Sequence, residues 1–210
     1  MKVSFAWCRS AACLLIFGGA CVAFRSEAGA GYALQFDGVS AYVQVANDNN
    51  LNAFPFTATA WFRTTNTSSA SQGIVSKYVD GTGNGWALIL QSGQLRGFYY
   101  RNNALSKAID AQSTALVSDG FWHHAALVVD GLGGKLYLDG IQVGSGLWTS
   151  SSGALVTSAP LLIGRYSSAL YPFLGTIDEV TLWSRALGAA EVNYLKHRQL
   201  NGNEDGIVGL

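Results

Sequence analysis

The carboxylates of this 210-residue chain are the first groups to test for catalytic chemistry, and they are sparse. Beyond residue 30 the glutamates are Glu179, Glu191 and Glu204. A retaining glycosidase needs two carboxyl groups about 5 Å apart, which on one strand requires positions i and i+2 because successive side chains face opposite ways. Glu179 has Ile177 and Thr181 at those positions, and Asp178 faces the other side. The pattern predicts that the chain is not an enzyme, with glycoside hydrolysis kept only as a remote alternative.

The adjacent histidines His123 and His124 do not indicate a metal site. Neighbouring residues of a strand point to opposite faces and cannot bind one ion together, and the sequence has no HExxH motif and no Cys/His cluster beside them. A GxSxG nucleophile motif is also absent. We interpret the pair as structural, with one imidazole on the sheet surface and the other hydrogen-bonded at the edge of the core.

Aromatic side chains near loops and strand ends are the remaining groups that could recognise a ligand. The candidates are Tyr99, Tyr100, Trp148, Tyr166 and Tyr171. Sugar rings stack on exposed aromatic rings through their C–H faces, and protein interfaces also favour such residues, so both kinds of ligand stay open. Four other tryptophans fall inside strand patterns and are predicted to be core residues: Trp61, Trp86, Trp122 and Trp183.

The elements that must position these groups read as strands joined by tight turns. Apolar residues make up 49% of the chain and charged residues only 12%, with 25 glycines, a mixture typical of all-β proteins. About eleven strands with regular turn signals predict an antiparallel two-sheet sandwich. A helical period appears only at Ala190, Val192 and Leu195, which predicts one short C-terminal helix. The formal net charge is zero, without a basic stripe that would indicate nucleic-acid binding.

The first thirty residues have the pattern of a signal peptide. Lys2 and Arg9 precede an apolar run from Ala11 to Phe24, which is shorter than the roughly 20 residues that span a bilayer, and a small-residue cleavage site follows at Ala28–Ala30. We therefore expect a secreted or cell-surface protein with no membrane span in its mature chain. All three cysteines lie in this leader, so the mature domain would lack disulfides.

Three strings resemble the laminin G-like jelly roll, a member of the concanavalin A-like lectin/glucanase superfamily. They are ALQFDGVSAYVQV near the start, FWHHAALVVD followed by KLYLDG, and GTIDEVTLWSRAL at residues 175–187. The resemblance covers about residues 32–200, and we assign residues 31–200 to one such domain. Residues 201–210 resemble the linker into a further unit, which predicts either a truncated record or the start of another repeat.

The resemblance implies recognition rather than catalysis. It predicts an exported module that binds carbohydrate or extracellular matrix. The alternative is a structural or adhesive repeat of a larger cell-surface protein that binds protein partners.

The resemblance also implies a structural Ca²⁺ near a sheet rim, carried over onto Asp178 and Asp37. Because the first and last strands of such sandwiches often pair, a cation there would tie the two chain ends together. Two carboxylates supply only part of the six to eight oxygens that calcium takes. The alternative is that Asp37 only shapes its turn and Asp178 accepts backbone N–H bonds.

Overall fold

The computed structural model describes residues 16–17, 20–21, 33–167, 171–198, 200 and 204–208. Most of the predicted leader and much of residues 201–210 lie outside the described residues, so the assignments made for both segments stay predictions. Within the leader, the two-residue strands β1 (Ile16–Phe17) and β2 (Ala20–Cys21) pair with each other. None of the helices in the described part of the chain is long and apolar enough to cross a membrane.

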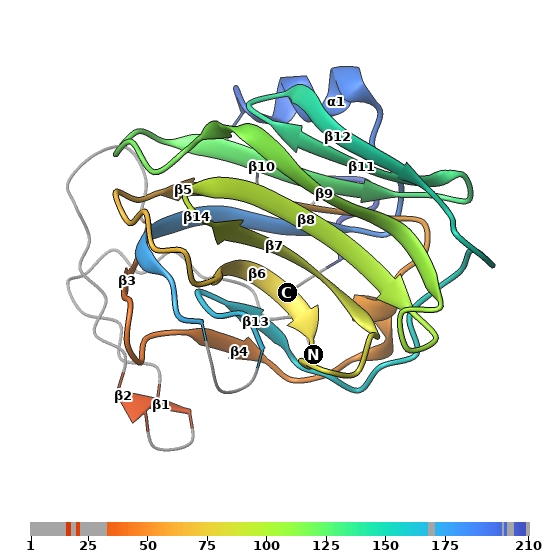
Figure 1. Ribbon diagram of the computed structural model, residues 1–210, viewed down its shortest axis with the longest axis horizontal. Helices are drawn as coiled ribbons and strands as arrows, with labels where there is room; N and C mark the ends of the chain where they lie inside the picture. Colours follow the sequence, from red (N-terminus) through yellow and green to blue (C-terminus); the bar gives the residue numbers. More distant parts are fainter. Residues whose placement is uncertain are drawn as a thin grey trace.

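Two antiparallel sheets of six strands form the domain, which confirms the predicted jelly-roll sandwich (Figure 1). The front sheet, which faces the viewer in Figure 1, has the order β4 (Val43–Val45), β13 (Leu161–Ile163), β6 (Gln72–Tyr78), β7 (Gly85–Gln91), β8 (Gln94–Arg101) and β9 (Ser106–Leu116). The back sheet has the order β12 (Ile141–Leu147), β11 (Gly133–Leu138), β10 (His123–Val129), β5 (Phe56–Arg63), β14 (Leu174–Trp183) and β3 (Leu34–Asp37). A 3₁₀ turn, η1 (Asn49–Asn52), precedes β5.

The core lies between the two sheets and follows from the two-residue period of the strands. In β5, Ala58, Ala60 and Phe62 belong to the central apolar cluster, while the alternate positions Thr59 and Trp61 face outward. The front sheet sends Trp86, Leu88 and Tyr99 into the same cluster. Burial of these side chains supplies most of the stabilisation of the sandwich, at roughly 1.5–3 kcal/mol for each large apolar side chain.

The first and last strands of the domain pair, as the resemblance predicted. Strand β3 runs antiparallel to β14, with Asp37 opposite Leu174 and Leu34 opposite Ile177. Farther along β14 the register against β5 shifts between Asp178 and Thr181, and Glu179 adopts a left-handed φ of 47° within this bulge. The pairing brings the two ends of the domain sequence together.

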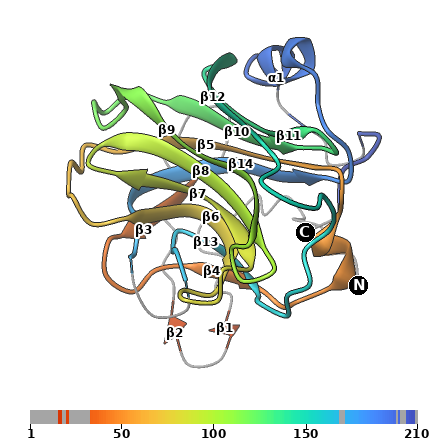
Figure 2. The ribbon, with the colours of Figure 1, turned by 45° about the vertical axis from the view of Figure 1, so that its right-hand side comes forward.

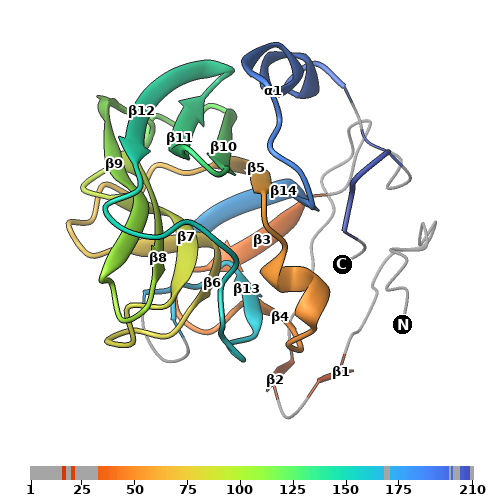
Figure 3. The same ribbon diagram turned by 90° about the vertical axis from the view of Figure 1, so that its right-hand side faces the viewer.

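The C-terminal helix α1 (Ala189–Leu195) packs on the outer side of the back sheet, away from the front sheet (Figures 2 and 3). Val192 and Leu195 join a second apolar cluster with Tyr137 and Trp183 of that sheet. The residue before the helix is Gly188, which has no side chain to cap it. The Glu191 carboxylate accepts a hydrogen bond from the Gly188 backbone N–H at 2.8 Å. This bond is one of the two hydrogen bonds of a capping box.

Lys77 on β6 is a fully buried cation. Its Nζ donates hydrogen bonds to Asn47 Oδ1 at 2.6 Å and to the Ala159 carbonyl oxygen. Burial lowers the pKa of Lys77 from 10.5 to about 8, although the nearby Asp48 opposes this effect. The ammonium therefore joins the loops before η1 and before β13, at the cost of dehydrating a charge.

We expect this burial to make stability increase with pH above neutrality. Between pH 8 and 10.5 the unfolded chain binds more protons at Lys77 than the folded chain does, so the free energy of unfolding increases across that interval. The Lys77 contribution amounts to at most about 3 kcal/mol. Urea unfolding of the protein and of Lys77→Met is measured at pH 7.5, 9 and 10. The difference in their free energies of unfolding gives the Lys77 contribution, because the other groups titrate equally in both proteins. A difference between the two that does not change with pH would contradict this account.

Candidate functional site

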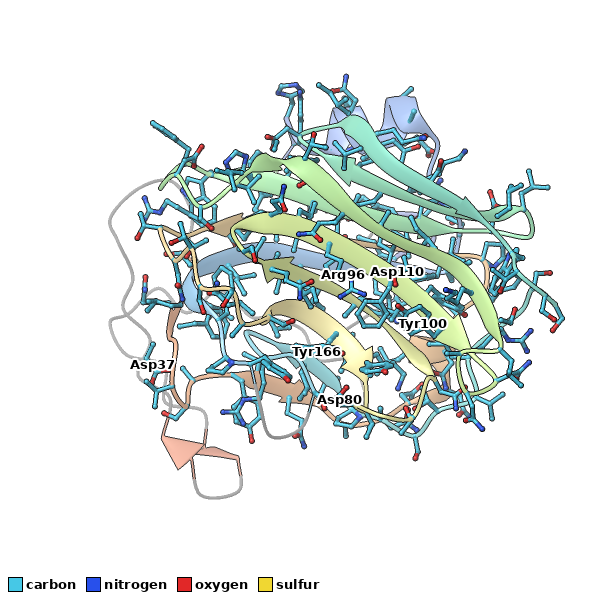
Figure 4. The ribbon with its side chains drawn as sticks, viewed as in Figure 1. Asp37, Asp80, Arg96, Tyr100, Asp110 and Tyr166 are labelled. Atoms are coloured by element: carbon cyan, nitrogen blue, oxygen red, sulfur yellow. The ribbon has the colours of Figure 1, made fainter. Side chains whose placement is uncertain are left out.

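Five aromatic side chains form a patch on the outer face of the front sheet. The aromatic patch consists of Tyr78 on β6, Phe98 and Tyr100 on β8, and Tyr166 and Tyr171 in the segment between β13 and β14. Alternation along β8 explains its origin, because Phe98 and Tyr100 point outward while Tyr99 between them points into the core. Figure 4 shows Tyr100 and Tyr166 on this face, together with Arg96 and Asp110.

The five rings of the aromatic patch contact one another in succession across the sheet. Tyr166 lies 5.4 Å from Tyr171 and stacks on Tyr78 at 5.6 Å. Tyr78 meets Phe98 edge-on at 5.1 Å, and Phe98 stacks on Tyr100 at 4.7 Å. Tyr78 and Phe98 are 8% and 2% exposed and form a buried floor, whereas the other three rings are partly exposed. The patch therefore offers several fixed ring surfaces to solvent.

Arg96, Asp110 and Tyr100 form a polar network beside these rings. Arg96 donates from Nε and Nη2 to the two carboxylate oxygens of Asp110, at 2.9 and 3.1 Å. Its Nη1 donates to Gln91 Oε1 at 3.2 Å. The Tyr100 hydroxyl donates to Asp110 Oδ2 at 2.5 Å. The network fixes the outward side chains of β8 and β9 relative to one another.

The ionisation states within this network follow from burial and pairing. Burial works against the charge of Asp110, but hydrogen bonds from Arg96 and Tyr100 outweigh it and lower the pKa of Asp110 below its usual value. Burial, followed by the contact with Asp110, raises the pKa of Tyr100. At neutral pH the network therefore contains one carboxylate, one guanidinium and one protonated phenol.

A groove of about 750 Å³ lies at the end of the patch, between the β6–β7 and β8–β9 loops. Its lining combines the Tyr78 ring with glycine backbone and two amide side chains, namely Tyr78, Gly81, Thr82, Gly83, Asn84, Asn103 and Ala104. The loops are joined by the Ala104 N–H, which donates to the Gly83 carbonyl oxygen at 2.8 Å, and by Asn84 Nδ2, which donates to Asn103 Oδ1 at 3.1 Å. The groove thus adds hydrogen-bonding groups next to the rings.

The segment that carries Tyr166 and Tyr171 is held close to β6. A Cβ atom on Gly73 would lie 2.0 Å from the backbone nitrogen of Tyr166, so only glycine permits this approach. Tyr171 has a φ of 67°, a left-handed conformation that costs a bulky residue roughly 1–3 kcal/mol. Its carbonyl oxygen accepts hydrogen bonds from the N–H groups of Gly73 and Tyr166, at 3.1 and 3.3 Å, which hold the strained residue in place.

The structure brings Tyr100, Tyr166 and Tyr171 together, corrects Tyr99 as a ligand-binding residue and places Trp148 apart from the aromatic patch. Tyr99 is 1% exposed in the central core, and its hydroxyl donates to the Gly153 carbonyl oxygen at 3.1 Å. Trp148 packs edge-on against Tyr99 at 5.7 Å and donates from Nε1 to the Asp130 carbonyl oxygen at 2.8 Å. Tyr99 is therefore occupied inside the sandwich, whereas Trp148 is partly buried and packs against the core. Trp122, predicted to be core, is instead 37% exposed.

Sequence reasoning missed the buried floor and the polar network. Arg96, Phe98 and Tyr100 stand at alternate positions, so the two-residue period of β8 could have placed them on one face. Asp110 lies opposite Phe98 on the neighbouring strand β9. That pairing depends on the strand register, which this stretch of sequence does not specify.

The two calcium candidates do not share a site. Asp37 pairs with Leu174 at one end of the β3–β14 ladder, whereas Asp178 lies four residues farther along β14. Asp37 Oδ1 accepts hydrogen bonds from the backbone N–H groups of Val39, Ser40 and Ala41 at 2.8–2.9 Å. Asp178 Oδ1 accepts one from Glu179 at 2.8 Å. Among the described residues no group of three His, Cys, Asp or Glu side chains could hold a metal ion, so these side chains do not fit a shared calcium site.

The carboxylates considered for hydrolysis lie on the back sheet, away from the aromatic patch. Asp178 is paired with Trp61 of β5, and Glu179 follows it in the bulge. Burial raises the pKa of both residues, and for Glu179 the charge of Asp178 adds to this effect. The Leu200 N–H donates to the Glu179 carboxylate, which gives this side chain a structural partner near the end of the helix.

The two histidines occupy separate positions, as their adjacency predicted. The predicted hydrogen bond of the buried imidazole is not formed at His124 Nδ1, which has no partner in the described part of the chain. His123 lies between two carboxylates, with Nδ1 2.8 Å from Asp139 Oδ2 and Nε2 3.1 Å from Asp119 Oδ1. These contacts raise the pKa of His123. His124 is 2% exposed, and burial lowers its pKa to about 4. Both imidazoles are therefore packed into the domain rather than presented to a common ligand.

The two six-stranded antiparallel sheets, with the aromatic patch on the outer face of one of them, form a lectin-like β-sandwich. A family model described as the concanavalin A-like lectin/glucanases superfamily matches residues 37–193, and the chain belongs to this superfamily. Neuronal pentraxin-2 of Cavia porcellus is 29% identical over 161 residues, which cover 70% of this chain and 35% of the pentraxin. The chain thus spans about a third of the length of that relative.

Solved structures with the same fold share little sequence with this chain. Domain 4 of AbnA, a GH43 extracellular arabinanase from Geobacillus stearothermophilus solved with arabinotriose, has a TM-score of 0.67 and 19% identity, covering 84% of this chain and 82% of that one. The Ruminococcus gnavus IT-sialidase CBM40 bound to α2,3-sialyllactose has a TM-score of 0.59 and 15% identity, covering 78% and 97%. At these identities the likeness concerns the fold alone.

We expect Asp37 to stabilise its turn in a calcium-independent way. Asp37→Ala removes the acceptor of three backbone N–H groups and should lower the free energy of unfolding by about 1–2 kcal/mol, the range for losing a capping side chain. The same bonds hold the pKa of Asp37 well below its usual range. This contribution is therefore present above about pH 4 and is lost as the pH falls through the folded-state pKa.

Urea unfolding of both proteins in millimolar Ca²⁺ and in EGTA measures this effect. Asp37→Asn is the matched control, because its amide oxygen can still accept the backbone bonds. A loss of stability that appears only when calcium is present would contradict the turn assignment and support calcium binding.

Proposed function

We propose that this protein is an exported, non-enzymatic recognition module that binds carbohydrate on the aromatic patch of its front sheet. The observation that carries the proposal is the set of partly exposed rings of Tyr100, Tyr166 and Tyr171 around a buried aromatic floor. Sugars present apolar C–H faces and a rim of hydroxyl groups, and this surface offers rings beside hydrogen-bonding groups.

The aromatic patch is organised before a ligand binds. Tyr166 is stacked on Tyr78, and Tyr100 on Phe98, so little side-chain entropy remains to be lost on binding. The carboxylate of Asp110 and the amides of Asn84 and Asn103 lie at its margins. These groups can exchange hydrogen bonds with sugar hydroxyls.

The comparisons support this choice of ligand class. Two proteins of the same fold were solved with oligosaccharides, arabinotriose in one and sialyllactose in the other. Transfer of that activity to this chain is a proposal, as is export through the leader at residues 1–30. A structural calcium ion also stays a proposal, and among the described residues no group of three or more His, Cys, Asp or Glu side chains could hold it.

Recognition of a protein partner is the second candidate function. Large apolar side chains are exposed at the end of the back sheet, where Phe121 is 72% and Trp122 37% exposed, and the Arg63 guanidinium lies 5.3 Å from the Trp122 ring. Exposed aromatic and arginine side chains of this kind are enriched in protein interfaces. The binding domain of Paraclostridial Mosquitocidal Protein 1, with a TM-score of 0.65 and 18% identity over 79% of this chain and 43% of that one, shares the fold.

Hydrolysis stays a remote alternative. Asp110 beside the aromatic patch is held by Arg96 and Tyr100, and a second carboxylate would have to stand about 5 Å away, or about 6.5–9.5 Å for an inverting enzyme. Asp178 and Glu179, the adjacent pair, belong to the other sheet. Hydrolysis of a polysaccharide panel that is lost in Glu179→Gln would overturn the non-enzymatic assignment.

Loss of a ring from the patch should weaken glycan binding without unfolding the domain. Tyr166→Ala removes a partly exposed ring and should weaken binding about tenfold, since ring contacts of this kind contribute on the order of 1 kcal/mol or more. A glycan array with the purified full chain identifies the ligand, and calorimetric titration then measures its dissociation constant for the protein and the variant.

Tyr194→Ala is the matched control, because Tyr194 is 59% exposed on α1 behind the back sheet. It should leave the dissociation constant unchanged, and thermal melting should show both variants folded. Equal affinity of all three proteins would place the glycan elsewhere. An array without any bound glycan, combined with binding to a protein that depends on Phe121 and Trp122, would favour the second candidate function.

A further inference from the structure

Arg96 is the basic group at the centre of the front sheet face, and its guanidinium is already occupied. The Nε and Nη2 donors form the two-pronged edge with which arginine binds a carboxylate. Both donate to Asp110, at 2.9 and 3.1 Å, and Nη1 donates to Gln91. The Arg96 and Asp110 side chains are each 29% exposed. An acidic sugar would therefore compete with an internal carboxylate for the same edge of the guanidinium.

Asp110 is also held from its other side, which makes its displacement costly. The Tyr100 hydroxyl donates to Asp110 Oδ2, and Tyr100 in turn stacks on Phe98. Moving the carboxylate away from Arg96 would break the ion pair together with this hydrogen bond. If the carboxylate stayed in place, an acidic sugar beside it would meet a like charge, and such juxtapositions are unfavourable in recognition sites.

Other cations near the patch do not provide a substitute for Arg96. Lys107 on β9 is exposed and contributes to lowering the pKa of Asp110, but an ammonium group is a hydrated point charge without the planar edge that selects a carboxylate. The Arg165 guanidinium lies over the Tyr42 ring at 4.1 Å, and Nη2 is 3.5 Å from the Ser40 carbonyl oxygen. Arg101 donates from Nη1 to the carbonyl oxygens of Ser151 and Ser152.

The polar groups around the rings instead suit uncharged hydroxyl groups. Gln112 Nε2 donates to Gln94 Oε1 at 2.9 Å, and Asn84 and Asn103 are paired at the groove. Amide side chains present both donors and acceptors. The Asp110 carboxylate has acceptor capacity beyond its three bonds, and the Tyr100 oxygen can accept from a sugar hydroxyl. Each of these groups can form a hydrogen bond with an uncharged sugar hydroxyl.

We propose that Asp110 acts as a specificity-determining residue, which occupies Arg96 and restricts the patch to neutral glycans while excluding those that carry a carboxylate. This inference rests on the proposed function, since it concerns the ligand class of the same surface. It requires that neutral sugars bind over the rings of Tyr100 and Tyr166, and that acidic sugars gain access to Arg96 only when Asp110 is removed.

The experiment uses an array of glycan pairs that differ by one acidic group, such as lactose with sialyllactose and a methyl-esterified oligogalacturonate with its free acid. The full-length protein is compared with Asp110→Ala, which frees the edge of Arg96, and with Arg96→Gln, which removes the guanidinium. Affinities of the pairs that bind are then measured by calorimetric titration, and the readout is the ratio of neutral to acidic affinity.

The unmodified protein should prefer the neutral member by at least about tenfold, and Asp110→Ala should reduce or invert this ratio. Arg96→Gln should not gain acidic binding, because it lacks the cation. Glu191→Gln is the matched control, since Glu191 pairs with Arg185 at 2.6 Å beside α1 and its loss should leave the ratio unchanged. Thermal melting identifies variants that do not fold. If Asp110→Ala does not fold, Asp110→Asn takes its place, because it keeps the shape of the side chain but not its charge.

Each outcome distinguishes the two levels of the proposal. Binding of acidic glycans by the unmodified protein, lost in Arg96→Gln, would overturn the role of Asp110 and leave the carbohydrate-binding function intact. An unchanged preference for neutral glycans in Asp110→Ala or Asp110→Asn would show that the selectivity has another source and would also overturn it. An array on which neither class binds would contradict the proposed function itself.

Discussion

The alternation of side chains along β8 is the constraint on which both the core and the ligand face depend. Leu95 and Tyr99 point into the sandwich, whereas Arg96, Phe98 and Tyr100 point outward. A single extended strand therefore contributes one row of side chains to the core and the other row to the proposed recognition surface. Because the period is two, a shift of register by one residue would bury the guanidinium and expose the core ring. The packing of the sandwich thus fixes the composition of the aromatic patch.

The same alternation explains which parts of the molecule could be predicted from sequence. The two-sheet architecture and the short helix α1 were predicted because strand periods and turn residues are local signals. The pairing of β3 with β14 was predicted from the resemblance alone. Tyr99 and Tyr100 are neighbours in the sequence, but Tyr99 is buried in the core and Tyr100 is partly exposed on the outer face. Their position near a strand end did not show which of the two rings faces solvent. Trp148 follows β12 and resembles a loop residue in the sequence, yet it closes the core against Tyr99.

What could not be predicted depends on contacts between distant segments. Tyr78 and Tyr166 are separated by most of the domain sequence, and they stack because the backbone at Tyr166 passes over Gly73. Asp37 and Asp178 belong to strands that do pair, but the register separates them along the ladder. The sequence motifs identified the two aspartates without fixing their offset along the ladder, and for Tyr166 they did not identify the partner Tyr78 at all.

Sparse charge gives each ion pair in this domain a larger effect on specificity. Only 12% of the residues are charged. Among the cations, Lys77 donates to oxygen acceptors and Arg96 donates to a carboxylate. An unpaired guanidinium on a surface of aromatic rings would attract anions of many kinds. Pairing with Asp110 leaves the position and the planar surface of the Arg96 guanidinium, 5.8 Å from the Phe98 ring, while the carboxylate balances its positive charge. The ion pair therefore fixes Arg96 and Asp110 beside the aromatic patch with their two charges balanced. If the patch binds glycans as proposed, discrimination depends on ring stacking and on the geometry of hydroxyl groups.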